Sequence, residues 1–169
     1  MKLLNSILLV CLFSAMAVSA IGQKIGYVNV QLVMAEMPEV KEANSNLETY
    51  NAQLSKRAEQ MYQSLQTKAV ALQQKSDNGE ISPKQFEIER ASLAQEEQKL
   101  VEFQSKSQND IAVKQNELLN PILKKVQDAI DAIAAEESYT YVFDSSQGMI
   151  LYADETADVT QKVKVKLGM

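Results

Sequence analysis

The sequence contains no histidine and no tryptophan, and its only cysteine, Cys11, lies in an apolar stretch near the N-terminus. Without histidine or a second cysteine, the chain lacks the usual side chains for a general base, a thiol nucleophile or a zinc site. It has only 5 Gly, and none of them forms a Gly-rich phosphate loop. The acidic pairs Glu96-Glu97 and Glu136-Glu137 are adjacent on predicted helices, so their side chains diverge. We therefore expect no enzymatic activity, no metal site and no cofactor.

Only one long apolar run is present, and it stands at the start of the chain. Lys2 is followed by "LLNSILLVCLFSAMAVSA", which ends in small residues and predicts a secretory signal peptide over residues 1–22. Cleavage is expected near residues 20–23, after either Ala20 or Gly22. The apolar run continues beyond Cys11, so we interpret this cysteine as part of the discarded segment and not as a lipid attachment site. The mature chain then has no cysteine, which excludes disulfides.

An excess of basic charge is also absent. The chain has 17 Lys+Arg against 22 Asp+Glu, and loss of Lys2 with the signal peptide leaves 16 against 22, a net charge of −6. Binding to nucleic acid through phosphate neutralisation is therefore not expected. No second apolar run is long enough for a stable membrane anchor. The remaining chain of about 147 residues is sufficient for one domain.

The middle of the chain, residues 38–119, predicts a long helical hairpin. From Pro38 to Lys75 there is no glycine and no internal proline, and the apolar positions repeat every eleven residues. Eleven residues over three turns is close to the natural helix period, which predicts a straight rod. The repeating positions are Ala43, Leu47, Tyr50, Leu54, Ala58, Met61, Leu65, Ala69 and Leu72.

A turn near residues 76–82 separates this helix from a second, antiparallel one. Asn78-Gly79 tolerates the backbone of a helix end, and Ser82, Pro83 and Gln85 predict a capping box with proline at the first helical position. The return helix should continue to about residue 135, with a kink or frayed turn near Asn120 caused by Pro121. Its apolar stripe is Phe86, Leu93, Leu100, Phe103, Ile111, Leu118, Ile122, Val126, Ile130 and Ile133. Two helices along one seam have little core, so the arm should soften toward its tip.

The chain ends predict a small body made of residues 23–37 and 120–169. A strand over 24–29 and a hairpin over 139–153, with its turn at 145–148, should form one sheet at the root of the arm. Three short strands expose two edges, and such edges are normally covered or paired, so we expect an oligomer. The terminal segment 159–167 fits either a strand or a helix. A second capping-box pattern at Asp158 and Gln161, with Gly168 as a stop, favours the helix.

The order of these elements resembles the Skp/OmpH-like periplasmic chaperones of outer-membrane proteins. The resemblance covers essentially the whole mature chain and rests on "KIGYVNVQLVMAEMPE", the charged hairpin, "NPILKKVQDAIDAIAAEESYTYVFDSS" and "YADETADVT". It implies an α+β fold, a jellyfish-shaped homotrimer in which a β body carries three coiled-coil-like arms. It also implies an ATP-independent holdase in the periplasm, which binds unfolded outer-membrane β-barrel proteins between the arms before their membrane insertion.

The resemblance carries over to particular residues. Segment 25–28 matches the first strand of the family, segment 142–144 the second, and Asp158 with Thr160 the start of the last helix, while Asn29 replaces a more frequent Asp. The expected oligomerisation residues are Ile25, Tyr27, Val28, Tyr141, Val142, Phe143, Ile150, Leu151 and Tyr152. Well-known members are basic, whereas residues 38–119 here hold 10 Lys+Arg and 13 Asp+Glu. This acidity argues against binding to lipopolysaccharide.

The arm also carries apolar residues off its seam, which are the candidate client contacts. These residues are Tyr62, Val70, Ile81, Ile88, Val101 and Val113. They could instead pack against a neighbouring arm or be scattered surface residues. The alternative function is a non-catalytic structural spacer or adaptor, for which the composition of the arm is nearly as suitable. Mobile arm tips would favour the holdase and stiff tips the adaptor.

Overall fold

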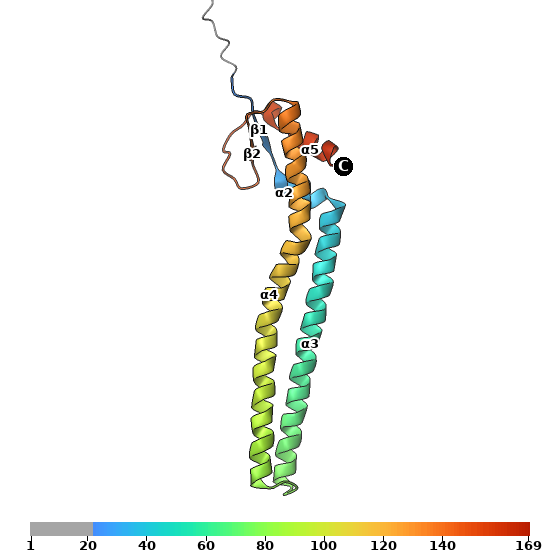
Figure 1. Ribbon diagram of the computed structural model, residues 1–169, viewed down its shortest axis with the longest axis vertical. Coiled ribbons are helices and arrows are strands. Elements are labelled where there is room, and N and C mark those ends of the chain that lie inside the picture. Colours follow the sequence, from blue (N-terminus) through green and yellow to red (C-terminus); the bar gives the residue numbers. More distant parts are fainter. Residues whose placement is uncertain (1–21) are drawn as a thin grey trace, which may run out of the picture.

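The computed structural model describes residues 22–169, so the predicted signal peptide lies almost entirely outside the described residues. Two long antiparallel helices, α3 (Pro38–Asp77) and α4 (Pro83–Glu136), extend from a small body at one end (Figure 1). At about 1.5 Å per residue, their 40 and 54 residues correspond to roughly 60 and 80 Å. The predicted combination of a long helical hairpin and a small sheet is confirmed.

The turn at the tip forms where the sequence predicts it. α3 ends at Asp77, and Gly79 has a φ of +69°, which glycine adopts without strain. The Ser82 hydroxyl accepts a hydrogen bond from the Gln85 backbone N–H at 3.2 Å, and Pro83 is the first residue of α4. The reciprocal half of the predicted capping box is wrong, because the Gln85 amide donates to Glu89 instead.

The eleven-residue repeat of α3 describes the seam of the arm. Ala43 and Leu72 are buried and the positions between them are half-buried, except Ala69, which is exposed. On α4 the inward positions repeat every seven residues instead, at Phe86, Leu93, Leu100, Ser107 and Lys114. A seven-residue and an eleven-residue repeat turn in opposite senses around a helix. Two of the inward positions of α4, Ser107 and Lys114, are polar, so the seam of the arm is not continuously apolar.

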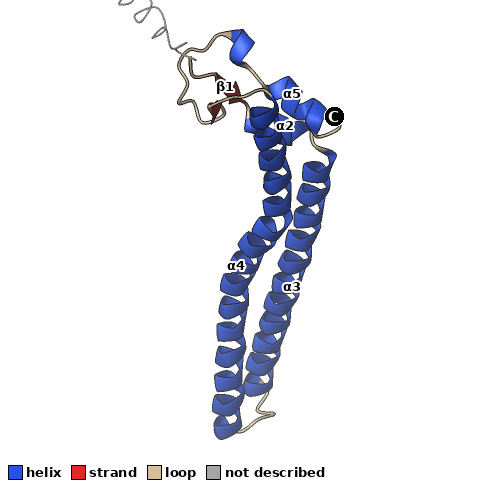
Figure 2. Ribbon diagram, turned by 45° about the horizontal axis from the view of Figure 1, so that its top comes forward, coloured by secondary structure: helices blue, strands red, loops and turns tan. Residues whose placement is uncertain are grey.

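α4 runs unbroken through Pro121, so the expected frayed turn is absent, but the helix bends. Figures 1 and 2 show α4 changing direction in the stretch coloured gold in Figure 1, while α3 beside it is straighter. Proline has no N–H for the Glu117 carbonyl and its ring crowds that carbonyl, which favours a bend just before it. Beyond the bend α4 joins the core of the body.

The core lies at the root of the arm and not along it. The largest fully buried side chains all belong to the body: Met37, Val28, Val33, Val126, Val159 and Val163. By contrast, α3 buries no side chain between Ala43 and Leu72, and α4 buries only Ser107 between Leu100 and Ile122. Apolar burial is the main source of stability, so the body stabilises the fold and the arm is held at its base.

A short helix, α2 (Val30–Glu36), links the first strand to α3 and was not predicted. Asn29 is its N-cap, and the Asn29 side-chain oxygen accepts from the Leu32 backbone N–H at 2.8 Å. The helix buries Val33 and leads into the fully buried Met37. Its spacing of apolar residues, 30, 33, 34 and 37, is a helix pattern that the strand prediction overlooked.

The sheet has two strands within the described residues, and the predicted hairpin is wrong. β1 (Ile25–Val28) pairs in parallel with β2 (Tyr141–Asp144), in the register Ile25 to Tyr141. Parallel neighbours need a long crossover connection, which here is the entire arm. After β2 the Asp144 carboxylate accepts from the backbone N–H and hydroxyl of Ser146, and a loop replaces the expected strand at 149–152.

The terminal segment is the helix α5 (Thr160–Lys166), as the prediction favoured, following the short 3-10 helix η1 (Glu155–Ala157). Its capping box is wrong: Asp158 precedes the N-cap, and its carboxylate accepts from the Thr160 N–H at 2.8 Å. The Thr160 hydroxyl in turn accepts from the Asn29 backbone N–H at 3.0 Å. Gly168 follows with a φ of +81°, the expected helix stop. α5 thereby ties the end of the chain to its beginning.

Candidate functional site

The predicted oligomerisation residues divide into an inward and an outward group. Val28 is buried, and Val142 packs against the same core. Tyr27 and Ile150 are half-buried. The outward group is exposed, and we call it, together with Met149, the body patch: Ile25, Tyr141, Phe143, Met149, Leu151 and Tyr152.

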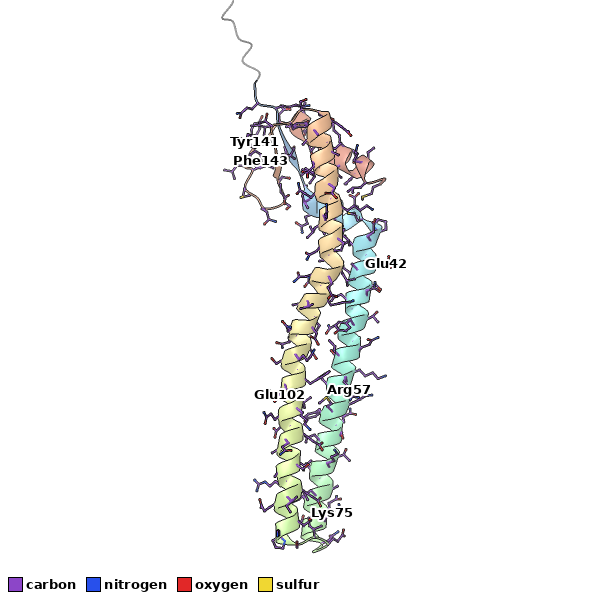
Figure 3. The ribbon with its side chains drawn as sticks, in the orientation of Figure 1. Glu42, Arg57, Lys75, Glu102, Tyr141 and Phe143 are labelled. Atoms are coloured by element: carbon purple, nitrogen blue, oxygen red, sulfur yellow. The ribbon has the colours of Figure 1, made fainter. Side chains whose placement is uncertain are left out.

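The body patch surrounds an open edge of the sheet. β1 is covered on its other side by a bridge between Tyr27 and Asp158, whereas β2 pairs only with β1 within the described residues. The rings of Tyr141 and Phe143 stack beside one another with centroids 6.1 Å apart, and Figure 3 shows both on the β2 side of the body. An unpaired strand edge beside exposed aromatic rings is a surface suited to another chain.

The loop after β2 is the most exposed apolar segment of the described chain. Met149, Leu151 and Tyr152 are 75%, 96% and 88% exposed. The loop, seen at the side of the body in Figures 1 and 2, separates β2 from η1. The apolar run of residues 149–152 was interpreted as a strand, so the sequence analysis did not predict an exposed loop here. Met149 was not among the predicted site residues.

Most candidate client contacts on the arm are exposed. Tyr62, Val70, Ile88, Val101 and Val113 have between 47% and 59% of their surface accessible, and Ile81 at the tip is half-buried. They lie on both helices and along most of the arm, so the structure does not bring them together into one patch. Each is separated from the next by polar residues.

The two faces of the arm differ in chemistry. One shallow groove between the helices is mainly apolar, with Tyr62, Leu65 and Ala69 of α3 opposite Leu93 and Ala94 of α4. The other face carries more charge, and we call it the charged face: Arg57, Lys68, Lys75, Glu89, Glu96 and Lys99 line it together with the apolar Met61, Ala71, Leu72 and Leu93. Helical spacing places these two sets on opposite sides of the seam. Arg57 and Lys75 are labelled along α3 in Figure 3.

Ion pairs connect the two helices on the charged face. The Lys68 ammonium lies 2.7 Å from a Glu96 carboxylate oxygen, and Lys75 is 4.0 Å from Glu89. Both pairs are partly exposed, and such pairs contribute little net stability. Glu97, adjacent to Glu96 in sequence, lines the apolar groove on the other side.

A second cluster of charges holds the two ends of the chain at the root. The Glu137 carboxylate is 2.7 Å from the Lys162 ammonium of α5 and 3.1 Å from that of Lys24, which precedes β1. These hydrogen bonds, first from Lys162 and then from Lys24, hold the pKa of Glu137 below its ordinary value. Lys24 also lies 4.0 Å above the ring of Tyr139.

The carboxylates of the two acidic pairs point to different partners or different sides of the molecule. Glu96 and Glu97 face opposite sides of the arm, and Glu136 pairs with Lys166 while Glu137 pairs with Lys162 and Lys24. Within residues 22–169, no three side chains of metal-binding type come together. In the same range no helix has both the length and the apolar character to cross a bilayer.

Known proteins are similar to this chain in sequence. Residues 24–167 match the family described as outer membrane protein (OmpH-like). The chain is 31% identical over 150 residues to chaperone protein Skp of Pectobacterium atrosepticum, covering 85% of this chain and 87% of that protein. It is 30% identical over 154 residues to chaperone protein Skp of Yersinia enterocolitica, covering 88% and 90%.

A solved structure has the same fold at lower identity. It is described as an outer membrane chaperone (OmpH-like) from Caulobacter crescentus and aligns with a TM-score of 0.75 at 15% identity. The alignment covers 86% of this chain and 84% of the other. At this identity the likeness concerns the fold alone. Its arm-and-body architecture agrees with the one derived above.

Proposed function

Because the chain belongs to the OmpH-like outer membrane protein family, we propose that it is a periplasmic, ATP-independent holdase chaperone. It binds unfolded outer-membrane β-barrel proteins in a cavity between helical arms and prevents their aggregation before membrane insertion. Two relatives at 31% and 30% identity are named chaperones. The signal peptide over residues 1–22 would export the chain to the periplasm and be removed.

The observation that carries this proposal is the set of exposed apolar side chains on a thinly packed arm. Tyr62 and Val101 are 52% and 59% exposed. The seam beside them buries few side chains, so these two residues do not have a core of the arm to pack into. Unfolded β-barrel strands alternate apolar and polar side chains. The apolar side chains of the client would be removed from water by contact with such an arm. The chaperone would then stabilise the unfolded state of the client by binding it in preference to the folded state. The arm comprises residues 38–119.

The body of the proposed chaperone, residues 23–37 with 120–169, joins the copies into a homotrimer. The open edge of β2 offers backbone groups to a neighbouring chain, and Leu151 and Tyr152 of the body patch would be covered by it. In a closed ring of chains every sheet edge is paired with a neighbouring chain, whereas a linear array of chains would leave the edges at its two ends unpaired. The number three comes from the family, whereas the edge itself requires only a partner.

The test is suppression of aggregation. A denatured outer-membrane β-barrel protein is diluted into buffer with or without a stoichiometric amount of the mature protein, without ATP, and light scattering is followed. We expect the protein to suppress scattering. Replacing both Tyr62 and Val101 by Ser should weaken suppression, whereas Gln66→Ser, a polar control in the same groove as Tyr62, should not. Scattering that rises as fast as in buffer alone would refute the proposal.

A structural adaptor is the second candidate, and the charged face of the arm favours it. The Lys68–Glu96 and Lys75–Glu89 pairs link the two helices across the seam, an arrangement consistent with a rod-shaped adaptor. Hydrogen exchange separates the two functions. Fast exchange of the amides in the middle of the arm supports the holdase, and slow exchange equal to that of the body supports the adaptor.

A further inference from the structure

We propose that Asn78-Gly79, at the tip of the arm, is a site of spontaneous deamidation that changes the charge and the backbone of the turn. It is the one Asn-Gly pair in the sequence. Both residues are exposed, and a Cβ added to Gly79 would meet no atom within 4 Å, so no neighbouring side chain packs over Gly79. This proposal does not depend on the chaperone function.

The reaction needs only water. The backbone nitrogen of Gly79 loses its proton and attacks the side-chain carbon Cγ of Asn78, so that a new N–Cγ bond forms. The Cγ–Nδ2 bond breaks, and the leaving NH2 group takes up a proton through water and departs as ammonia. The product is a five-membered succinimide. Water then adds to one of its two carbonyl groups and opens the ring, giving either aspartate or isoaspartate. Glycine at the second position removes the side chain that would hinder the attack.

The hydrogen bonds that oppose the reaction lie at the exposed end of α3, where they open easily. The Gly79 N–H donates to the Ser76 carbonyl at 3.0 Å, and the Asn78 amide donates to Glu80 at 2.9 Å. These bonds must open before the attack. They lie beyond Leu72, the last buried side chain of α3, and are exposed to water. Such end turns open locally without unfolding of the rest.

The same helix contains a matched comparison site. Asn44 is also exposed and is followed by Ser45, whose nitrogen lies within the regular part of α3, next to the buried Ala43. Both the N–H and the C=O of this peptide group lie within the regular i to i−4 hydrogen bonding of the helix. Attack on the Asn44 side chain requires the helix to open near its well-packed base. We therefore expect Asn44 to deamidate far more slowly than Asn78.

The consequence of the reaction is a less stable tip. Asp77 and Glu80 already flank Asn78 at the C-terminal, negative end of the α3 dipole. A carboxylate in place of the amide adds a third negative charge there and replaces a donor to Glu80 by a repelling oxygen. Isoaspartate also inserts an extra carbon into the backbone of the turn. Both products favour fraying of the last turn of α3.

The experiment follows the full mature protein during prolonged incubation at mildly alkaline pH. Peptide mapping by mass spectrometry measures conversion at Asn78 and Asn44, and labelling with a protein isoaspartyl methyltransferase and a labelled methyl donor detects isoaspartate. We expect conversion at Asn78 to be at least an order of magnitude faster than at Asn44. Asn78→Gln should abolish the label at the tip while leaving the circular dichroism spectrum unchanged.

A second variant separates the chemistry from its effect. Freshly prepared Asn78→Asp carries the new charge before isoaspartate forms at the Asp-Gly pair, and we expect faster hydrogen exchange of the amides just before residue 78 than in the parent. Equal conversion at Asn78 and Asn44 would overturn the proposal. So would methyltransferase labelling of the tip peptide that persists in Asn78→Gln. Unchanged exchange in Asn78→Asp would overturn the stated consequence.

Discussion

Truncation of Met37 tests whether the fold is stabilised at its root. Met37 is 1% exposed, the largest of the fully buried side chains, and lies where α2 meets α3. Met37→Ala removes three heavy atoms from the core, a change that costs about 2–5 kcal/mol when the site cannot collapse. A single domain has a total stability of about 5–15 kcal/mol. We therefore expect a large loss of stability.

The matched control is Met61→Ala on the seam of the arm. Met61 is half-buried and faces a shallow groove beside Arg57. Its truncation leaves little cavity, and alanine has a better helix propensity than methionine, so a loss below about 1 kcal/mol is expected. Urea unfolding at one fixed protein concentration compares the two, because an oligomer's stability depends on concentration. Equal midpoints, or a larger shift for Met61→Ala, would refute the idea of a stable root and a soft arm.

Three further outcomes are expected. Leu151→Asp should lower the native mass by breaking the proposed oligomer, whereas Gln147→Asp in the same exposed loop should not, and mass measurement in solution checks this. Ser82→Ala should cost about 1 kcal/mol at the start of α4, seen as faster hydrogen exchange there with the body unaffected. Because the pKa of Glu137 is lowered in the folded chain, its contribution is present above the unfolded pKa and is lost as the pH falls through the folded value. Glu137→Gln should therefore be less stable than the parent at neutral pH and converge with it in acid, which thermal unfolding at several pH values measures.

The arm could be predicted from sequence because its signals are local. The eleven-residue repeat, Pro38, and the Ser82 cap each act within one or two turns, and the structure places the helix ends at these residues. Ala69 is the exception along the α3 seam. It lines the open groove opposite Leu93 and Ala94, so its exposure depends on the other helix and not on α3 alone.

The sheet could not be predicted in the same way, because strand pairing depends on distant residues. β2 pairs with β1, which lies more than a hundred residues earlier in the sequence. The two strands are parallel because the arm between them returns the chain to the end of the body from which β1 starts. The run at 149–152 has strand-like composition but no partner within the described chain. The exposure of Tyr62 and Val101 followed from their positions off the seam, whereas the separation of apolar and charged faces required both helices.

The weakness of each arm contact explains why a chaperone of this shape needs several arms. Tyr62 and Val101 are already about half covered, so full burial by a client yields roughly half of the 1.5–3 kcal/mol typical of such side chains. Fixing one client residue costs about 1–2 kcal/mol of backbone entropy. One contact therefore does not hold a client segment. In the proposed trimer, several arms fixed to one body would raise the effective concentration of the remaining contacts, so a client would be retained although no single contact is strong.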